Sequence, residues 1–123
     1  MKIRIKGNYL RFRLRQDDVA ALTNNGSIVE RIEFGETTDQ QISFALESCG
    51  EEKMTIAYNN NKVRVLVPKQ FIERWINTEQ VGIAVELITG RNRTVSVLIE
   101  KDFACLDASE EDNVGTYSHP LSD

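Results

Sequence analysis

Residues 2–15 alternate between basic and apolar side chains with a period of two. This alternation predicts two amphipathic strands joined by a two-residue turn at Gly7-Asn8. Closing the hairpin places Ile5 opposite Leu10 and Arg4 opposite Arg11, so apolar side chains share one face and cations share the other. We call the second face the basic face; its residues are Lys2, Arg4, Lys6, Arg11, Arg13 and Arg15.

The same alternation recurs along the chain and predicts six more strands, in residues 27–34, 41–47, 53–58, 62–67, 82–89 and 93–100. Two short helices lie between these hairpins. The first stops at Asn24-Asn25-Gly26, and the second begins at Pro68 and ends at Asn77. The second helix has an apolar stripe that includes Trp75, which predicts that this helix packs on a sheet.

The two halves of the chain share one order of elements, which is hairpin, helix, hairpin. A shift of 53 positions carries Leu10 to Val63 and Glu47 to Glu100, with a one-residue slip across the strand at 27–34. We therefore expect an internal duplication of a ββαββ unit, with halves at about residues 1–50 and 53–103.

Eight mostly antiparallel strands and two short helices predict an α+β domain with one of two architectures. The strands either close into a barrel or form two sheets packed face to face. If the aliphatic faces line the interior, the cations lie outside and the interior is dry. If the basic face points inward, the barrel becomes an anion-binding tunnel.

The charge distribution separates a domain from an acidic C-terminal tail. The 123 residues have a net charge of −4, but residues 102–123 hold six acidic residues and no basic one. We expect a single β-rich domain at residues 1–103, which is long enough to bury a core. Residues 104–123 are predicted to be a flexible acidic tail, because they contain too few apolar residues to offset the entropy of ordering.

Neither the cysteines nor the hydropathy pattern indicates secretion or a membrane protein. Cys49 and Cys105 lie far apart without metal-ligand spacing, so we expect free thiols in a reducing cytoplasm. The N-terminus lacks the apolar stretch of a secretory signal, and no run approaches the roughly 20 apolar residues of a membrane span. We therefore expect a cytoplasmic protein that does not bind membranes.

The basic face is the strongest candidate for a functional site. Like charges that lie opposite each other destabilise a pair of strands by up to about 1 kcal/mol, so solvent, carboxylates or a bound anion must compensate them. The candidate anion-binding residues are Lys2, Arg4, Lys6, Arg11 and Arg13. A solvated face is the alternative, and nucleic acid is disfavoured because the protein is acidic and only Tyr9 could stack on bases.

No residue pattern predicts catalysis, a metal site or a cofactor. His119 is the only histidine and lies in the tail, and the glycines form no phosphate-binding loop. Trp75 is assigned to the core. The glutamates of the strands are interpreted as solvated outer-face residues, namely Glu30, Glu33, Glu47, Glu86 and Glu100.

Residues 2–8 with 10–14, and residues 99–106, resemble a family of small bacterial proteins without assigned function. The resemblance implies a stand-alone bacterial cytoplasmic protein and carries over no catalytic residue. A distant architectural analogy links the eight strands to the triphosphate tunnel family, whose first strand binds metal through alternating glutamates. Lys2, Arg4 and Lys6 occupy those places here, so the sequence does not support a metal-dependent phosphatase.

Three hypotheses about function follow. The first is a non-enzymatic binding or regulatory module whose basic face binds an anionic ligand or protein, with the acidic tail competing for that face. The alternative is a barrel that binds a small phosphate-containing molecule or acts on it, so enzymatic activity stays open. The third is self-association through exposed sheet edges.

Overall fold

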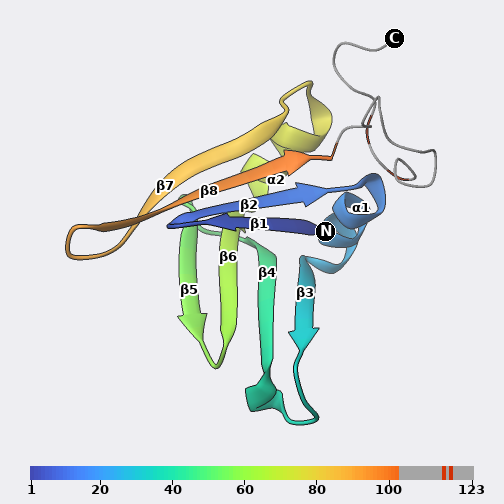
Figure 1. The fold of residues 1–123 in the computed structure, drawn as a ribbon. Helices are drawn as coiled ribbons and strands as arrows, with labels where there is room; N and C mark the ends of the chain where they lie inside the picture. The colour runs from blue at the N-terminus through green and yellow to red at the C-terminus, as the bar shows by residue number, and fades with distance from the viewer. Residues whose placement is uncertain (103–114, 116, 118–123) are drawn as a thin grey trace.

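The computed structural model describes residues 1–102, 115 and 117, and Figure 1 shows its ribbon. The elements in chain order are β1 (Lys2–Lys6), β2 (Tyr9–Leu14), α1 (Gln16–Asn25), β3 (Ser27–Glu33), a 3₁₀ turn η1 (Thr38–Gln40), β4 (Gln41–Cys49), β5 (Thr55–Asn59), β6 (Lys62–Pro68), α2 (Lys69–Asn77), β7 (Gly82–Gly90) and β8 (Arg93–Lys101). Every predicted strand and helix is present, and only η1 was not predicted.

The strands form two four-stranded sheets that pack against each other. The first has the order β1-β2-β8-β7 and the second has the order β3-β4-β6-β5. In Figure 1 the strands of the first sheet run across the direction of those of the second. The prediction of an α+β fold with two packed sheets is confirmed, whereas the eight strands do not close into a barrel.

The predicted pairing within the hairpins is confirmed residue by residue. β1 pairs with β2 from Lys2 opposite Arg13 to Lys6 opposite Tyr9, and β7 pairs with β8 through Ile83 opposite Ile99. The two-residue turn after β1 requires a left-handed backbone, which Gly7 adopts with φ of 58°. The equivalent turn of the third hairpin uses two asparagines with positive φ, residues 60 and 61.

Each sheet combines one hairpin from each half of the chain. β2 is parallel to β8 with Tyr9 opposite Ser96, and β6 is parallel to β4 with Lys62 opposite Ser43. The shift of 53 positions carries Tyr9 to Lys62 and Ser43 to Ser96. It therefore relates the two parallel pairs of strands to each other. The ββαββ unit is therefore repeated, and the two copies exchange hairpins.

The slip predicted for the strand at 27–34 is two residues rather than one. Ser27 pairs with Glu47 in the first half, and Gly82 pairs with Glu100 in the second. The shift from 27 to 82 is 55, which is two more than 53. A slip of one residue would turn every side chain of the strand to the opposite face, whereas a slip of two keeps the same side chains inside.

One hydrophobic core lies between the two sheets and under both helices. Phe12, Leu46, Val65 and Trp75 are fully buried in it. Helix α1 contacts β2, β3 and β4, and α2 contacts β4, β6 and β7, so each helix touches both sheets. Trp75 is a core residue, as predicted, and its Nε1 donates a hydrogen bond to the carbonyl oxygen of Val81 at 2.9 Å.

The aliphatic side of the first hairpin faces this core, so the basic face points outward. Leu10, Phe12 and Leu14 are buried, whereas Arg4 on the opposite side is exposed. The alternative of an inward basic face that lines a tunnel is therefore wrong. The analogy to the triphosphate tunnel family finds no support in this arrangement.

Several predictions concern residues outside the described part of the chain. Cys105, His119 and the flexible acidic tail at 104–123 fall there, apart from Gly115 and Tyr117. Cys49 is a free, half-buried cysteine at the end of β4. No helix in residues 1–102 is long and apolar enough to cross a membrane.

Candidate functional site: the basic face of the first hairpin

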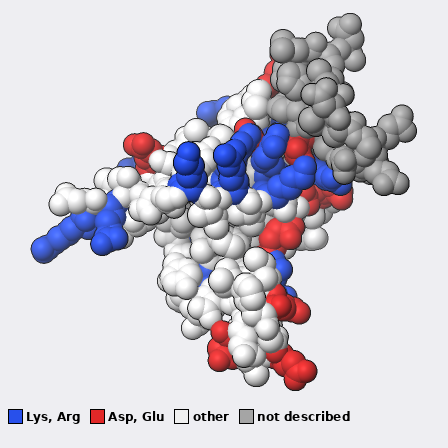
Figure 2. Space-filling view, in the orientation of Figure 1, with Lys and Arg blue, Asp and Glu red and all other residues white. Residues whose placement is uncertain are grey.

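The cations of the basic face form a row on the outer surface of β1 and β2. Figure 2 shows this row as a band of Lys and Arg side chains across the middle of the molecule. The residues on β1 are exposed, and the arginines at positions 11, 13 and 15 are half-buried. The hairpin register fixes the row, because Arg4 lies directly opposite Arg11 and Lys2 lies opposite Arg13.

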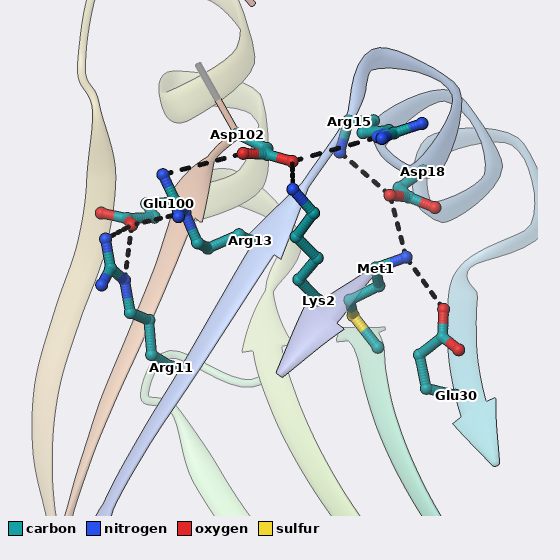
Figure 3. A network of polar contacts seen from close by, with 9 residues as sticks. All are labelled: Met1, Lys2, Arg11, Arg13, Arg15, Asp18, Glu30, Glu100 and Asp102. Atoms are coloured by element: carbon teal, nitrogen blue, oxygen red, sulfur yellow. Dashed lines mark hydrogen bonds and ion pairs between the residues drawn. The ribbon is translucent and has the colours of Figure 1, made fainter. Parts of the chain in front are cut away.

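Glu100 at the end of β8 compensates two of the arginines (Figure 3). The Arg11 Nε donates a hydrogen bond to Glu100 Oε1 at 2.6 Å, and the Arg13 Nε lies 3.2 Å from the same oxygen. In the parallel pairing of β2 with β8, Arg13 lies opposite Glu100, so their side chains project from the same face of the sheet. This carboxylate holds both guanidinium groups in place.

Asp102 is a second carboxylate at the same end of the hairpin, and its side chain is only 3% exposed. Its Oδ2 lies 3.0 Å from the Lys2 Nζ and 4.0 Å from the Arg15 Nε, and its Oδ1 lies 3.7 Å from the Arg13 Nη2. The Asp102 N–H donates to the Leu14 carbonyl oxygen at 2.8 Å, which extends the pairing of β8 with β2. Although the sequence grouped this residue with the acids of the C-terminal region, it belongs to the folded domain.

Two of the five predicted anion-binding residues keep their charge uncompensated. Within the described residues, Arg4 and Lys6 form no ion pair, whereas Lys2, Arg11 and Arg13 pair with Glu100 or Asp102. Among the described residues, Glu100 and Asp102 are the carboxylates that pair with this face, and neither of them reaches Arg4 or Lys6. The face keeps an excess of positive charge, and that excess is most accessible at the turn end of β1.

The N-terminal ammonium group anchors the other end of β1 beside the basic face (Figure 3). The Met1 nitrogen donates to Glu30 Oε1 at 2.8 Å and lies 3.1 Å from Asp18 Oδ2. Burial alone would lower the pKa of the Met1 ammonium, but the hydrogen bond to Glu30 and the contact with Asp18 outweigh it and raise the pKa above its ordinary value of 8.0. Asp18 also accepts a hydrogen bond from the Arg15 N–H at 2.9 Å, which caps α1.

The ion pair between Arg11 and Glu100 has a counterpart in the second sheet. Arg64 donates two hydrogen bonds to Glu47, both of 2.8 Å. Position 64 is 11 plus 53, and position 47 is 100 minus 53, so the two pairs are equivalent in the repeat. The hydrogen bonds from Arg64 hold the pKa of Glu47 below its usual value of 4.5.

The interpretation of the strand glutamates as solvated is wrong for three of the five. Glu30, Glu47 and Glu100 are ion-paired, whereas Glu33 and Glu86 are exposed. The partners of Glu47 and Glu100 lie on parallel neighbouring strands, which pattern analysis does not pair. The sequence signal that relates these ion pairs is the shift of 53 positions. It carries Arg11 to Arg64 and Glu47 to Glu100.

We predict that Glu47→Gln changes the acid stability of the protein. A carboxyl group whose pKa is lower in the folded state stabilises that state above its unfolded pKa of about 4.5, and this contribution is lost as the pH falls through the folded pKa. The variant should be less stable than the wild type at pH 7, and the two stabilities should converge as the pH falls from 4.5 through the folded pKa of Glu47. Urea unfolding at a series of pH values measures this difference.

Glu86→Gln is the matched control for this prediction. Glu86 is an exposed glutamate on β7 that forms no ion pair among the described residues. Its replacement should leave the pH profile of the wild type nearly unchanged. A destabilisation by Glu47→Gln that stays constant from pH 7 to about pH 3 would contradict the role of the ionised pair.

The described residues do not assemble a metal site. Within residues 1–102, 115 and 117, no three His, Cys, Asp or Glu side chains gather in a group that could hold a metal ion. The chemistry that these residues do bring together is a preorganised set of guanidinium and ammonium groups on a rigid hairpin. Such a set can bind anions by charge and by hydrogen bonds.

Comparison with known proteins places the chain in a family but gives no function. No curated protein and no solved structure matches it. A family model matches residues 1–121, and it describes a family of unknown function, DUF7009. The resemblance to a family without assigned function is thereby confirmed, and the chain belongs to the family of unknown function DUF7009.

Proposed function

We propose that this protein is a non-enzymatic binding or regulatory module of the bacterial cytoplasm, and that its basic face binds an anionic partner. The observation that supports the proposal is that Arg4 and Lys6 are exposed on the basic face and form no ion pair among the described residues. Arg11 and Arg13 are already ordered by Glu100, so binding costs less side-chain entropy there.

Binding through this face depends on salt. Exposed charges separated by more than the Debye length of about 10 Å at 0.1 M salt are largely screened from each other. A partner held mainly by Arg4 and Lys6 should therefore bind tightly at low ionic strength and weakly at high ionic strength. The acidic C-terminal region, which holds Glu110, Glu111 and Asp112, competes for the face in this proposal.

The experiment is calorimetric titration of the full chain with inorganic polyphosphate at low salt. The double variant Arg4→Glu/Lys6→Glu should bind at least about tenfold more weakly than the wild type. Arg31→Glu/Lys53→Glu is the matched control, because it makes the same change in charge at two exposed residues outside the basic face. Equal losses in both variants would show that polyphosphate responds only to net charge, and the proposal would fail.

Two further arms test the rest of the proposal. Glu110→Gln/Glu111→Gln/Asp112→Asn should raise the affinity for polyphosphate if the acidic region competes for the basic face. A thermal shift with inorganic phosphate or ATP that exceeds the shift with polyphosphate at equal concentration would favour the alternative of a small phosphate-containing ligand, because a ligand that binds the folded state stabilises it by RT ln(1 + [L]/Kd), which grows as the dissociation constant falls.

A further inference from the structure

Strand β1 is an edge of the first sheet, and the outer side of its backbone is unpaired. Ser96 N–H donates to the Asn8 carbonyl and Asp102 N–H donates to the Leu14 carbonyl, so the even-numbered residues of β2 turn their backbone toward β8. The odd-numbered residues therefore bond to β1, where they lie opposite even-numbered partners. The N–H and C=O groups of Ile3 and Ile5 point away from β2, and no described backbone group bonds to them.

The two faces of this edge strand have different chemistry. Lys2, Arg4 and Lys6 lie on the basic face, and Ile3 and Ile5 lie on the other. Ile5 is 60% exposed although it is apolar. The edge therefore presents cations and apolar groups in strict alternation, together with free backbone donors and acceptors.

Ile5 also lines an open apolar groove of about 640 Å³. Its other walls include Leu10 and the β5 residues Ile56 and Tyr58. In Figure 1 the turn between β1 and β2 lies beside the upper part of β5, and residues of the turn and of β5 line the same groove. Tyr58 is 68% exposed at this rim, so apolar surface continues from the edge strand into the groove.

We infer that β1 accepts an additional strand from an acidic protein partner, a segment in which carboxylate and apolar side chains alternate. The N–H and C=O groups of Ile3 and Ile5 pair with the backbone of that segment. Its carboxylates lie opposite Arg4 and Lys6, where side chains on paired strands are about 5 Å apart. Its apolar side chains lie opposite Ile3 and Ile5, and the one opposite Ile5 lies beside the groove.

The inference rests on the proposed function and narrows the partner to a protein segment. Polyphosphate and nucleic acid offer charge, but they have neither a backbone that extends a sheet nor apolar groups with a period of two. An extended acidic polypeptide matches the cations, the free backbone groups and the alternating apolar side chains of β1 at the same time. Main-chain hydrogen bonds supply affinity in this mode, and alternate side chains supply specificity.

The test compares three fluorescein-labelled peptides by anisotropy at low salt. The first has the core Glu-Val-Glu-Val-Glu-Val-Glu, the second is Glu-Glu-Val-Val-Val-Glu-Glu, and the third is the first peptide with N-methylated valines. All have the same charge and composition of side chains. The alternating peptide should bind at least about tenfold more tightly than either of the others, because only it satisfies both faces and the backbone.

Ile5→Pro tests the same contact from the side of the protein. Proline removes an N–H that is unpaired in the free protein, so the edge strand can still fold, and thermal unfolding verifies this. The variant should lose the preference for the alternating over the shuffled peptide. Ile5→Val keeps the N–H and the apolar side chain, so it should keep the preference.

Three outcomes separate this inference from the proposed function. Equal binding of the alternating and shuffled peptides, with loss of both in Arg4→Glu/Lys6→Glu, would overturn strand addition and leave anion binding intact. Failure of the peptides and of polyphosphate alike would overturn both. A dimer in sedimentation that Ile5→Pro abolishes would assign the edge to a second copy of the chain, and would also overturn the inference.

Discussion

Replacing Trp75 by alanine is expected to lower the free energy of unfolding by about 3–5 kcal/mol. The side chain is 0% exposed, and it fills the space between α2 and the two sheets. Its loss leaves a cavity and also removes the hydrogen bond to the Val81 carbonyl. Because single domains are stable by only about 5–15 kcal/mol, urea unfolding followed by circular dichroism should show a large fall in the midpoint.

Two variants separate the parts of this effect. Trp75→Phe keeps most of the apolar contact and removes the indole donor, while the Val81 carbonyl still accepts a hydrogen bond from the Lys101 N–H at 3.2 Å, so it should cost about 0.5–1.5 kcal/mol. Tyr58→Ala removes an aromatic side chain that is 68% exposed and should cost less than about 0.5 kcal/mol. Equal costs for Trp75→Ala and Tyr58→Ala would show that α2 does not depend on this packing.

Asp102→Asn is expected to change stability and anion binding in opposite directions. The buried carboxylate faces Lys2, Arg13 and Arg15, which repel one another once its charge is removed. Because these cations are partly exposed and screened, we expect a loss of about 1–2 kcal/mol rather than the larger cost of a fully buried pair. The affinity for polyphosphate should rise, because the basic face then loses one of the two carboxylates that pair with it among the described residues.

Salt and a second variant distinguish this effect from general destabilisation. The loss of stability should shrink in 1 M salt, where the Debye length is about 3 Å. Glu47→Gln removes a carboxylate from an ion pair outside the basic face, so it should destabilise the fold without raising polyphosphate affinity. A variant Asp102→Asn that binds polyphosphate no better than the wild type would contradict the charge balance derived for the face.

The hairpins were predictable because their determinants are local. The Gly7-Asn8 turn and the alternation on both sides of it fix the register of β1 and β2, and the structure confirms each pair. The same holds for β7 and β8, where Val85 lies opposite Val97. Outward placement of the cations could not be decided from one hairpin, because it depends on what packs against the aliphatic face.

The pairing between hairpins could not be predicted, because it joins segments far apart in the chain. The alternation within the hairpins does not indicate that β2 lies parallel to β8 or that β4 lies parallel to β6, and the shift of 53 relates these two pairs to each other without saying which strands pair. The carboxylates that organise the basic face are positioned by that pairing, so Glu100 was interpreted as solvated and Asp102 as part of the acidic region. The candidate cations were named correctly as residues of one face, while their partners were missed.

The exchange of hairpins between the two halves has a consequence for biosynthesis. β8 lies between β2 and β7, and it is the last of the strands in the described residues to leave the ribosome. Until residue 101 has emerged, β2 has no neighbour on one side, and the apolar side chains of the first hairpin have no complete sheet to join. Neither half can finish a sheet alone, so the two are expected to acquire native structure together, as one cooperative unit, after β8 has emerged.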